Sequence, residues 1–122
     1  MPKPANKLGQ QGEDAVRAML TKRDFIILDT NYHTRFGELD IVARQKDRLY
    51  FIEVKTRRSQ RYGSGPAALT DQKQDRLRQS ANLYRQAKKL TDLPYQFDLV
   101  TIEKERDKWR WRWLDNIIED ED

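Results

Sequence analysis

Three charged residues in the first half of the chain have the types and spacing of a metal-dependent phosphodiesterase centre. Glu53 and Lys55 are two residues apart in an apolar, β-prone run, so on a strand their side chains project to the same face. Asp40 lies on what the pattern predicts to be the preceding strand. If a hairpin loop with an even number of residues joins the two strands, Asp40 lies beside Glu53 or Lys55, whereas an odd-numbered loop separates them.

Two carboxylates and an ammonium group in one place have a defined chemical use. Carboxylate oxygens are ligands for Mg²⁺ or Mn²⁺, and such a metal activates a water molecule and neutralises phosphate charge during hydrolysis. We predict that Asp40 and Glu53 bind the metal and that Lys55 orients or deprotonates the water or stabilises developing charge. The alternative is an edge strand with a surface Glu–Lys pair, in which Asp40 is a lone hairpin carboxylate.

The apolar periodicity predicts an α/β domain whose elements follow in the order αβββαββ. The predicted elements are a helix at 3–22, strands at 25–32, 38–44 and 49–56, a helix capped by Thr70 and running to 89, and strands at 95–102 and 109–114. A hairpin turn is expected at 45–48, and a loop rich in glycine and cations is expected at 57–69.

The predicted helices bring two further charged residues toward the same place. Lys73 lies four residues before Leu77, on the inward face of the second helix, where it could contact phosphate or, alternatively, cover apolar surface with its stem. Glu13 lies three residues before Val16, at the flank of the buried stripe of the first helix. It could be a third acidic ligand, and the alternative is a solvated helix carboxylate.

The composition is that of one small domain with a thin core. The chain has 122 residues, of which 37% are hydrophobic and 36% charged. It contains no cysteine, which excludes disulfides and thiolate metal sites and fits a reducing compartment. The longest apolar run near the start, 25–28, is far shorter than a membrane span or a signal-peptide core. We expect a soluble, cytoplasmic protein with no membrane contact.

Charge is unevenly distributed along the chain. The acidic tail 119–122 carries four negative charges, and its removal would change the formal net charge from +4 to +8. We therefore expect a single domain at 1–118 with a basic body, followed by a solvated acidic tail. A basic body favours polyanionic partners such as nucleic acid.

The segment 108–113 alternates tryptophan with cations. On a strand this alternation makes one aromatic face and one basic face. The tryptophans could stack on nucleic-acid bases, but we expect them to pack in the core, because a small domain needs that apolar area. His33 is the sole histidine, which excludes a multi-histidine zinc site.

A succession of short motifs runs through nearly the whole chain. In order they are Gly12-Glu13-x-Ala15, Asn31-Tyr32, Gly37-Glu38-Leu39-Asp40-Ile41-Val42-Ala43, Phe51-Ile52-Glu53-Val54-Lys55-Thr56-Arg57, Lys73 and Phe97-Asp98-Leu99-Val100. This succession resembles the small bacterial YraN-type proteins, a family similar to archaeal Holliday-junction resolvases. The resemblance implies the restriction-endonuclease-like fold, with an αβββαβ core in which a central mixed sheet is flanked by helices.

The resemblance also implies roles for individual residues. Asp40 and Glu53 would bind Mg²⁺ or Mn²⁺, Lys55 would support the nucleophile or the transition state, and Glu13 would complete the acidic cluster as a third metal ligand. The predicted nucleic-acid contacts are Lys73, Arg57 and Arg35. Where relatives often carry an arginine after Asn-Tyr, this chain has His33.

Taken together, these observations predict a metal-dependent DNA endonuclease that hydrolyses phosphodiester bonds, with branched, Holliday-junction-like DNA as one candidate substrate. A symmetric homodimer is expected if the substrate is branched, since two strands must be cut in register. Two alternatives stay open. One is a nucleic-acid-binding module with a relict site, and the other is a protein-interaction adaptor whose Glu–Lys pairs are structural.

Overall fold

The order of helices and strands is the one that the periodicity predicts. The computed structural model describes residues 7–58 and 69–118. Within these ranges the elements are α1 (Lys7–Lys22), β1 (Ile26–Thr34), β2 (Gly37–Gln45), β3 (Arg48–Arg58), α2 (Asp71–Ala87), β4 (Tyr95–Glu105) and β5 (Lys108–Leu114). No helix in the described ranges is long and apolar enough to cross a membrane.

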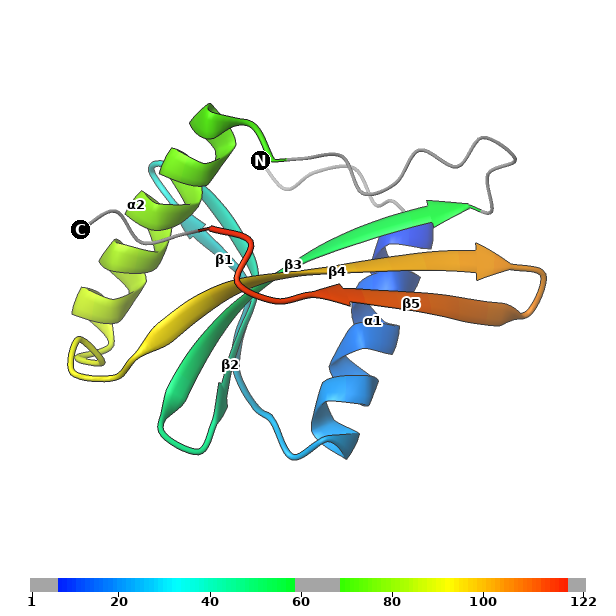
Figure 1. Ribbon diagram of the computed structural model, residues 1–122, viewed down its shortest axis with the longest axis horizontal. Helices are drawn as coiled ribbons and strands as arrows, with labels where there is room; N and C mark the ends of the chain where they lie inside the picture. The colour runs from blue at the N-terminus through cyan, green and yellow to red at the C-terminus, as the bar shows by residue number, and fades with distance from the viewer. Residues whose placement is uncertain (1–6, 59–68, 119–122) are drawn as a thin grey trace.

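The described strands form one mixed sheet in the spatial order β1-β2-β3-β4-β5 (Figure 1). The pairs β1–β2, β2–β3 and β4–β5 are antiparallel, as expected for strands joined by tight turns. The pair β3–β4 is parallel, and the connection between these strands contains α2. The predicted α/β class, with a central mixed sheet flanked by helices, is therefore confirmed.

The two helices pack on opposite faces of the sheet. Val16 of α1 belongs to a buried cluster with Ile52 of β3, whereas Tyr84 of α2 belongs to a second cluster with Phe51. Because adjacent strand residues project to opposite faces, Phe51 and Ile52 must face different helices. Each helix thus covers its own side of the sheet, with α1 beside β3 and α2 beside β2.

Most strands extend further than the hydrophobic pattern predicts. The hairpins stay paired up to two-residue turns, with Thr34 opposite Gly37, Gln45 opposite Arg48, and Glu105 opposite Lys108. Polar residues at strand ends contribute backbone hydrogen bonds but no apolar alternation, so the pattern stops short of the turn. The predicted N-cap of the second helix is confirmed, since the Thr70 side chain accepts a hydrogen bond from the Lys73 N–H. The helix α2 ends two residues earlier than predicted.

Some predicted features fall partly or wholly outside the described residues. The first four residues of the predicted first helix, 3–6, and the acidic tail, 119–122, lie outside them. The predicted loop at 57–69 is wrong at its start, because β3 continues through residues 57 and 58, which pair with β4. Residues 59–68 of that loop lie outside the described ranges.

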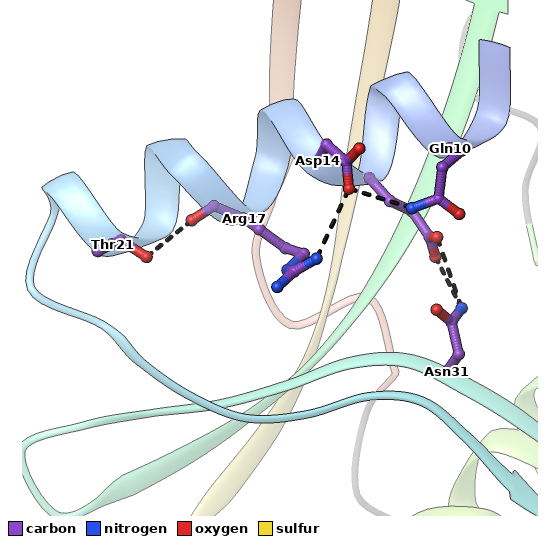
Figure 2. Close-up of polar contacts among 6 residues, drawn as sticks. Gln10, Asp14, Arg17, Thr21 and Asn31 are labelled. Carbon is purple, nitrogen blue, oxygen red and sulfur yellow. Dashed lines mark hydrogen bonds and ion pairs between the residues drawn. The ribbon is translucent and has the colours of Figure 1, made fainter. Parts of the chain in front are cut away.

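A change of backbone direction at Asn31 interrupts the alternation of β1. Asp29 and Tyr32 both face α2, since Tyr84 Oη donates to Asp29 Oδ2 at 2.6 Å and the Tyr32 and Tyr84 rings lie 4.9 Å apart. Residues three apart on a regular strand would face opposite sides. Asn31 accommodates the change with φ of 49°, a left-handed conformation that asparagine tolerates well. Its own side chain points toward α1 (Figure 2).

Candidate functional site

Asp40 and Glu53 meet where β2 and β3 stop pairing. The two strands are joined by a two-residue turn and remain in register from Gln45 opposite Arg48 to Ile41 opposite Ile52. Asp40 and Glu53 are the next residues along the two strands, immediately beyond the last pair. The even-numbered loop that this site requires is therefore present.

The two carboxyl groups are in direct contact. The Asp40 carboxylate accepts a hydrogen bond of 3.0 Å from the Val54 N–H, and the side chains of Asp40 and Glu53 are hydrogen-bonded to each other. Burial, reinforced by the charge and the hydrogen bond of Asp40, raises the pKa of Glu53 well above its usual range, and the Lys73 ammonium acts in the opposite direction. Two carboxyl groups held this close disfavour simultaneous ionisation.

Three cations share the α2 side of the sheet with Glu53. Lys55 is two residues beyond Glu53 and therefore on the same face of β3. Partial burial, followed by the positive charges of Arg57 and Lys73, lowers the pKa of Lys55. Lys73 lies in the first turn of α2, close enough to influence both Glu53 and Lys55. The structure thus brings the predicted residues Glu53, Lys55, Arg57 and Lys73 together on the α2 side of the sheet.

Glu13 approaches the pair from the other side, on α1. The helix lies close to β3 at Gly12, where a Cβ atom would come 2.9 Å from the Thr56 Cβ. The Glu13 carboxylate accepts from Asn31 Nδ2 at 3.1 Å, a bond drawn in Figure 2. Burial, and next the charge of Asp40, raise the pKa of Glu13. Glu13 therefore lies near Asp40, held there by an asparagine to which sequence reasoning gave no role.

Of the three predicted metal ligands, the structure brings Asp40 and Glu53 into contact. Within residues 7–58 and 69–118, no group of three or more His, Cys, Asp and Glu side chains is gathered closely enough to hold a metal ion. The contact between Asp40 and Glu53 offers two carboxyl groups as side-chain ligands, in the oxygen chemistry that Mg²⁺ and Mn²⁺ accept. The role of Glu13 as a third ligand stays a prediction.

The other predicted nucleic-acid contact, Arg35, lies in the turn between β1 and β2. It is exposed, and its guanidinium group lies 4.9 Å from the centre of the Phe36 ring. His33 is also exposed, opposite Glu38 in the β1–β2 hairpin. The role of Arg35 in nucleic-acid binding stays a prediction.

The tryptophans of β5 pack mainly as expected. One of them, Trp113, is hydrogen-bonded to Asp98, whose burial was not predicted from the sequence. Trp109 and Trp113 join the α1-side cluster, while Trp111 is 41% exposed. The Trp113 Nε1–H donates to Asp98, a fully buried carboxylate that also accepts from Gln96 and from the Asn116 N–H. A charged residue inside the apolar run of β4 was the available indication, because a buried charge requires partners.

Comparison with known proteins identifies the family of the chain. Residues 12–102 match the model of a family described as "Uncharacterised protein family UPF0102", and this range includes every predicted site residue. A UPF0102 protein of Dictyoglomus turgidum is 40% identical over 96 residues, covering 79% of this chain and 81% of the relative. The corresponding protein of Syntrophomonas wolfei is 42% identical over 96 residues, covering 79% and 84%. One from Neisseria gonorrhoeae is 35% identical over 101 residues, covering 83% and 88%. The chain therefore belongs to the uncharacterised protein family UPF0102.

Proposed function

We propose that the protein is a Mg²⁺- or Mn²⁺-dependent DNA endonuclease that hydrolyses phosphodiester bonds. The observation that carries this proposal is the contact between the Asp40 and Glu53 carboxyl groups at the point where β2 and β3 separate. Two carboxylates held in contact repel each other, and a divalent cation relieves this repulsion by binding to both. The residues present therefore fit a hard divalent metal.

Asp40 and Glu53 would hold the metal, whose other coordination positions would be available to water and to phosphate oxygens. When bound, the ion supplies Lewis acidity and lowers the pKa of a water molecule. The carboxylate of Asp40 is already oriented by the Val54 N–H, which reduces the entropy lost on binding. Glu13, which lies near Asp40, adds negative charge to the cluster and so strengthens its attraction for a cation.

The cations around the pair supply the positive charge that phosphate chemistry requires. Lys55 is placed to stabilise charge on the phosphate or to orient the attacking water, and its lowered pKa makes proton exchange with that water easier. Lys73 and Arg57, whose charges act on Lys55, would contact the same phosphate group. Lysine and arginine side chains around a carboxylate pair favour a negatively charged phosphodiester over a neutral substrate.

DNA is the proposed substrate because the body of the chain is basic and because its motifs resemble those of restriction-endonuclease-like proteins. Branched DNA is the finer proposal, through the similarity of the YraN-type motifs to Holliday-junction resolvases. Cleavage of a branched substrate in two strands would require two copies of the site, and hence a symmetric dimer.

The experiment that tests the proposal is cleavage of single-stranded, duplex and four-way-junction DNA in the presence of Mg²⁺ or Mn²⁺. Asp40→Asn and Glu53→Gln should each reduce the cleavage rate by more than about 100-fold, since even outer-shell changes at metal sites cost 10- to 100-fold. Asp47→Asn is the matched control, because Asp47 lies in the turn of the same hairpin and its side chain is 91% exposed. Equal loss in all three variants, or cleavage that survives in the first two, would contradict the assigned site.

A second candidate function is a nucleic-acid-binding module with a relict site. One observation favours it: the described residues gather no group of three acidic or histidine ligands, fewer than a tightly held metal usually has. Such a module would bind DNA in a salt-dependent way but would neither bind Mn²⁺ nor cut DNA. A protein-interaction adaptor, by contrast, would fail to bind DNA even at low salt.

A further inference from the structure

One face of the sheet changes character along the strands. On the α2 side of β3, Phe51 is buried against the helix, and the next residues on that face are Glu53, Lys55 and Arg57. The opposite face stays apolar at the same level, with Ile102 of β4 in the buried cluster beneath α1. Figure 1 shows that β3, β4 and β5 continue past α2. The α2-side face is therefore apolar beneath α2 and charged beyond that helix.

Strand register extends the charged part of this face to the edge of the sheet. Lys55 pairs with Thr101, which in turn pairs with Arg112. Arg57 is related to Arg110 in the same way, through a residue of β4. Directly paired residues share a face, so the cations of β3 and β5 lie on one surface. The backbones of Lys55 and Arg112 are separated by two strand spacings, about 10 Å.

We call the surface formed by Lys55, Arg57, Lys108, Arg110 and Arg112 the basic sheet face. Two carboxylates of β4 share it, Glu103 between Arg57 and Arg110, and Glu105 opposite Lys108. Glu105 forms a 3.0 Å ion pair with Arg110, whose side chain is nevertheless 71% exposed. Five cations against two carboxylates leave the surface with a net positive charge.

The basic sheet face is continuous with the candidate site, because Lys55 belongs to both. Its outer part comes from β5, which lies beyond residues 12–102, the range matched by the family model. The tryptophans that alternate with the arginines project to the other face, where Trp109 and Trp113 pack against the α1-side cluster. The packing of these tryptophans holds the arginines of β5 outward, on a rigid sheet and not on a loop.

We propose that the basic sheet face binds the phosphate backbone of DNA next to the phosphate that reaches Asp40 and Glu53. The inference rests on the proposed function, and it adds that β5 carries part of the substrate-binding surface. A rigid row of arginines is suited to phosphate groups, because each guanidinium presents a planar set of donors. Contacts of this kind position the duplex without reading its sequence.

Binding and cleavage are measured separately to test this inference. Labelled duplex and four-way-junction DNA are titrated by fluorescence anisotropy in EDTA, over a series of NaCl concentrations. The variants are Arg110→Gln/Arg112→Gln and a control, Lys22→Gln/Lys46→Gln, which removes two exposed cations at the end of α1 and in the β2–β3 turn. Both double variants lose the same formal charge. Thermal melting shows that each is folded, and cleavage with Mn²⁺ is then followed at saturating DNA.

Arg110→Gln/Arg112→Gln should weaken binding at 0.1 M salt by on the order of 10- to 100-fold and reduce the slope of log K against log salt by about 2. The control should keep both the wild-type slope and the wild-type cleavage rate at saturating DNA. Equal binding by the two double variants would overturn the role of β5 while leaving the proposed hydrolysis intact. Wild-type binding without cleavage would instead overturn the hydrolysis, and the comparison of slopes would still decide the role of β5.

Discussion

The Asp40 carboxylate accepts a 3.0 Å hydrogen bond from the backbone N–H of Val54, on the neighbouring strand. Backbone pairing between β2 and β3 ends one residue earlier, at Ile41 and Ile52. The Asp40 side chain therefore accepts the hydrogen bond of the Val54 N–H, which in a continued ladder would go to a backbone carbonyl of β2. This substitution allows the two strands to separate without leaving an unpaired donor, and it anchors Asp40 at the point where Glu53 and Glu13 approach.

The raised pKa of Glu53 predicts that the metal-free protein loses stability as the pH rises. A carboxyl group with a higher pKa in the folded state binds more protons folded than unfolded, so the free energy of unfolding falls as the pH rises from the ordinary value of 4.5 through the folded pKa. The raised pKa of Glu13 acts in the same direction. The melting temperature in EDTA should therefore decrease as the pH rises above 4.5.

Glu53→Gln should flatten this decrease and, near neutral pH without metal, melt at a higher temperature than the wild type. The exposed carboxylate Asp47 provides the control, since Asp47→Asn should follow the wild-type curve. Addition of Mn²⁺ should raise the melting temperature of the wild type but not of Glu53→Gln. A wild-type pH dependence in Glu53→Gln would show that Glu53 does not cause the loss of stability.

Lys73 is predicted to set the pH range in which the site works. Its positive charge lowers the pKa of Glu53 and also the pKa of Lys55. Lys73→Met removes that charge, so both pKa values rise and the pH–rate profile of cleavage should move to higher pH. Because metal binding requires deprotonated carboxylates, cleavage at pH 7 should fall by on the order of 10-fold.

Arg76→Met is the matched control for this profile, since Arg76 is an exposed cation on the same helix. It should leave the position of the profile unchanged. A uniform loss of rate in Lys73→Met, without displacement along the pH axis, would restrict Lys73 to substrate binding.

Gly12 is predicted to be essential for the approach of α1 to β3. A Cβ atom at this position would lie 2.7 Å from Thr56 Cγ2 and 2.9 Å from Thr56 Cβ, and the short β-branched side chain cannot move aside. Gly12→Ala should destabilise the protein by about 1–3 kcal/mol in urea unfolding. It should also slow cleavage, because it displaces the neighbouring Glu13.

A double-mutant cycle with Thr56→Ala isolates this steric effect. Thr56→Ala removes Oγ1 and Cγ2, the two atoms that lie closest to a Cβ at position 12, so the double variant should recover part of the stability lost by Gly12→Ala. Additive losses in the double variant would mean that the contact with Thr56 is not the cause.

Asp98 is predicted to hold the last strand in place. This buried carboxylate accepts hydrogen bonds of 2.8 Å from Gln96 Nε2, 2.9 Å from Trp113 Nε1 and 3.1 Å from the Asn116 N–H. Asp98→Ala leaves all three donors unpaired and should reduce the free energy of unfolding by about 3–5 kcal/mol. Asp115 is exposed and serves as the control. Asp115→Ala should change the free energy of unfolding by less than about 0.5 kcal/mol.

The element order could be predicted because it follows from local properties. Apolar residues recur at helical spacing in α1, and the run that contains Glu53 and Lys55 alternates as a strand does. Strand ends were underestimated, since residues such as Arg57 pair through the backbone and carry no apolar signature. The interruption of β1 at Asn31 was not predicted for a similar reason. A residue in the left-handed conformation changes which face the following side chains occupy, and it leaves no mark in the composition of the strand.

The kinds of side chain at the candidate site can be read from the sequence. So can the strand face on which residues close together in the chain lie. Two residues apart on a strand, Glu53 and Lys55 must project together, because the side-chain period is a property of the local backbone. The two-residue turn of the hairpin brings Asp40 beside Glu53. From the sequence this placement could be predicted only if the loop had an even number of residues.

Relationships between segments that are remote in the chain depend on how the elements pack together. The bond from Asn31 to Glu13 depends on how α1 docks on the sheet, and the alignment of Arg112 with Lys55 depends on the register of three strands. Neither docking nor register is encoded in a local period, since both follow from the packing of the two cores on opposite faces. The contact between the Asp40 and Glu53 carboxyl groups likewise exists only in the folded protein.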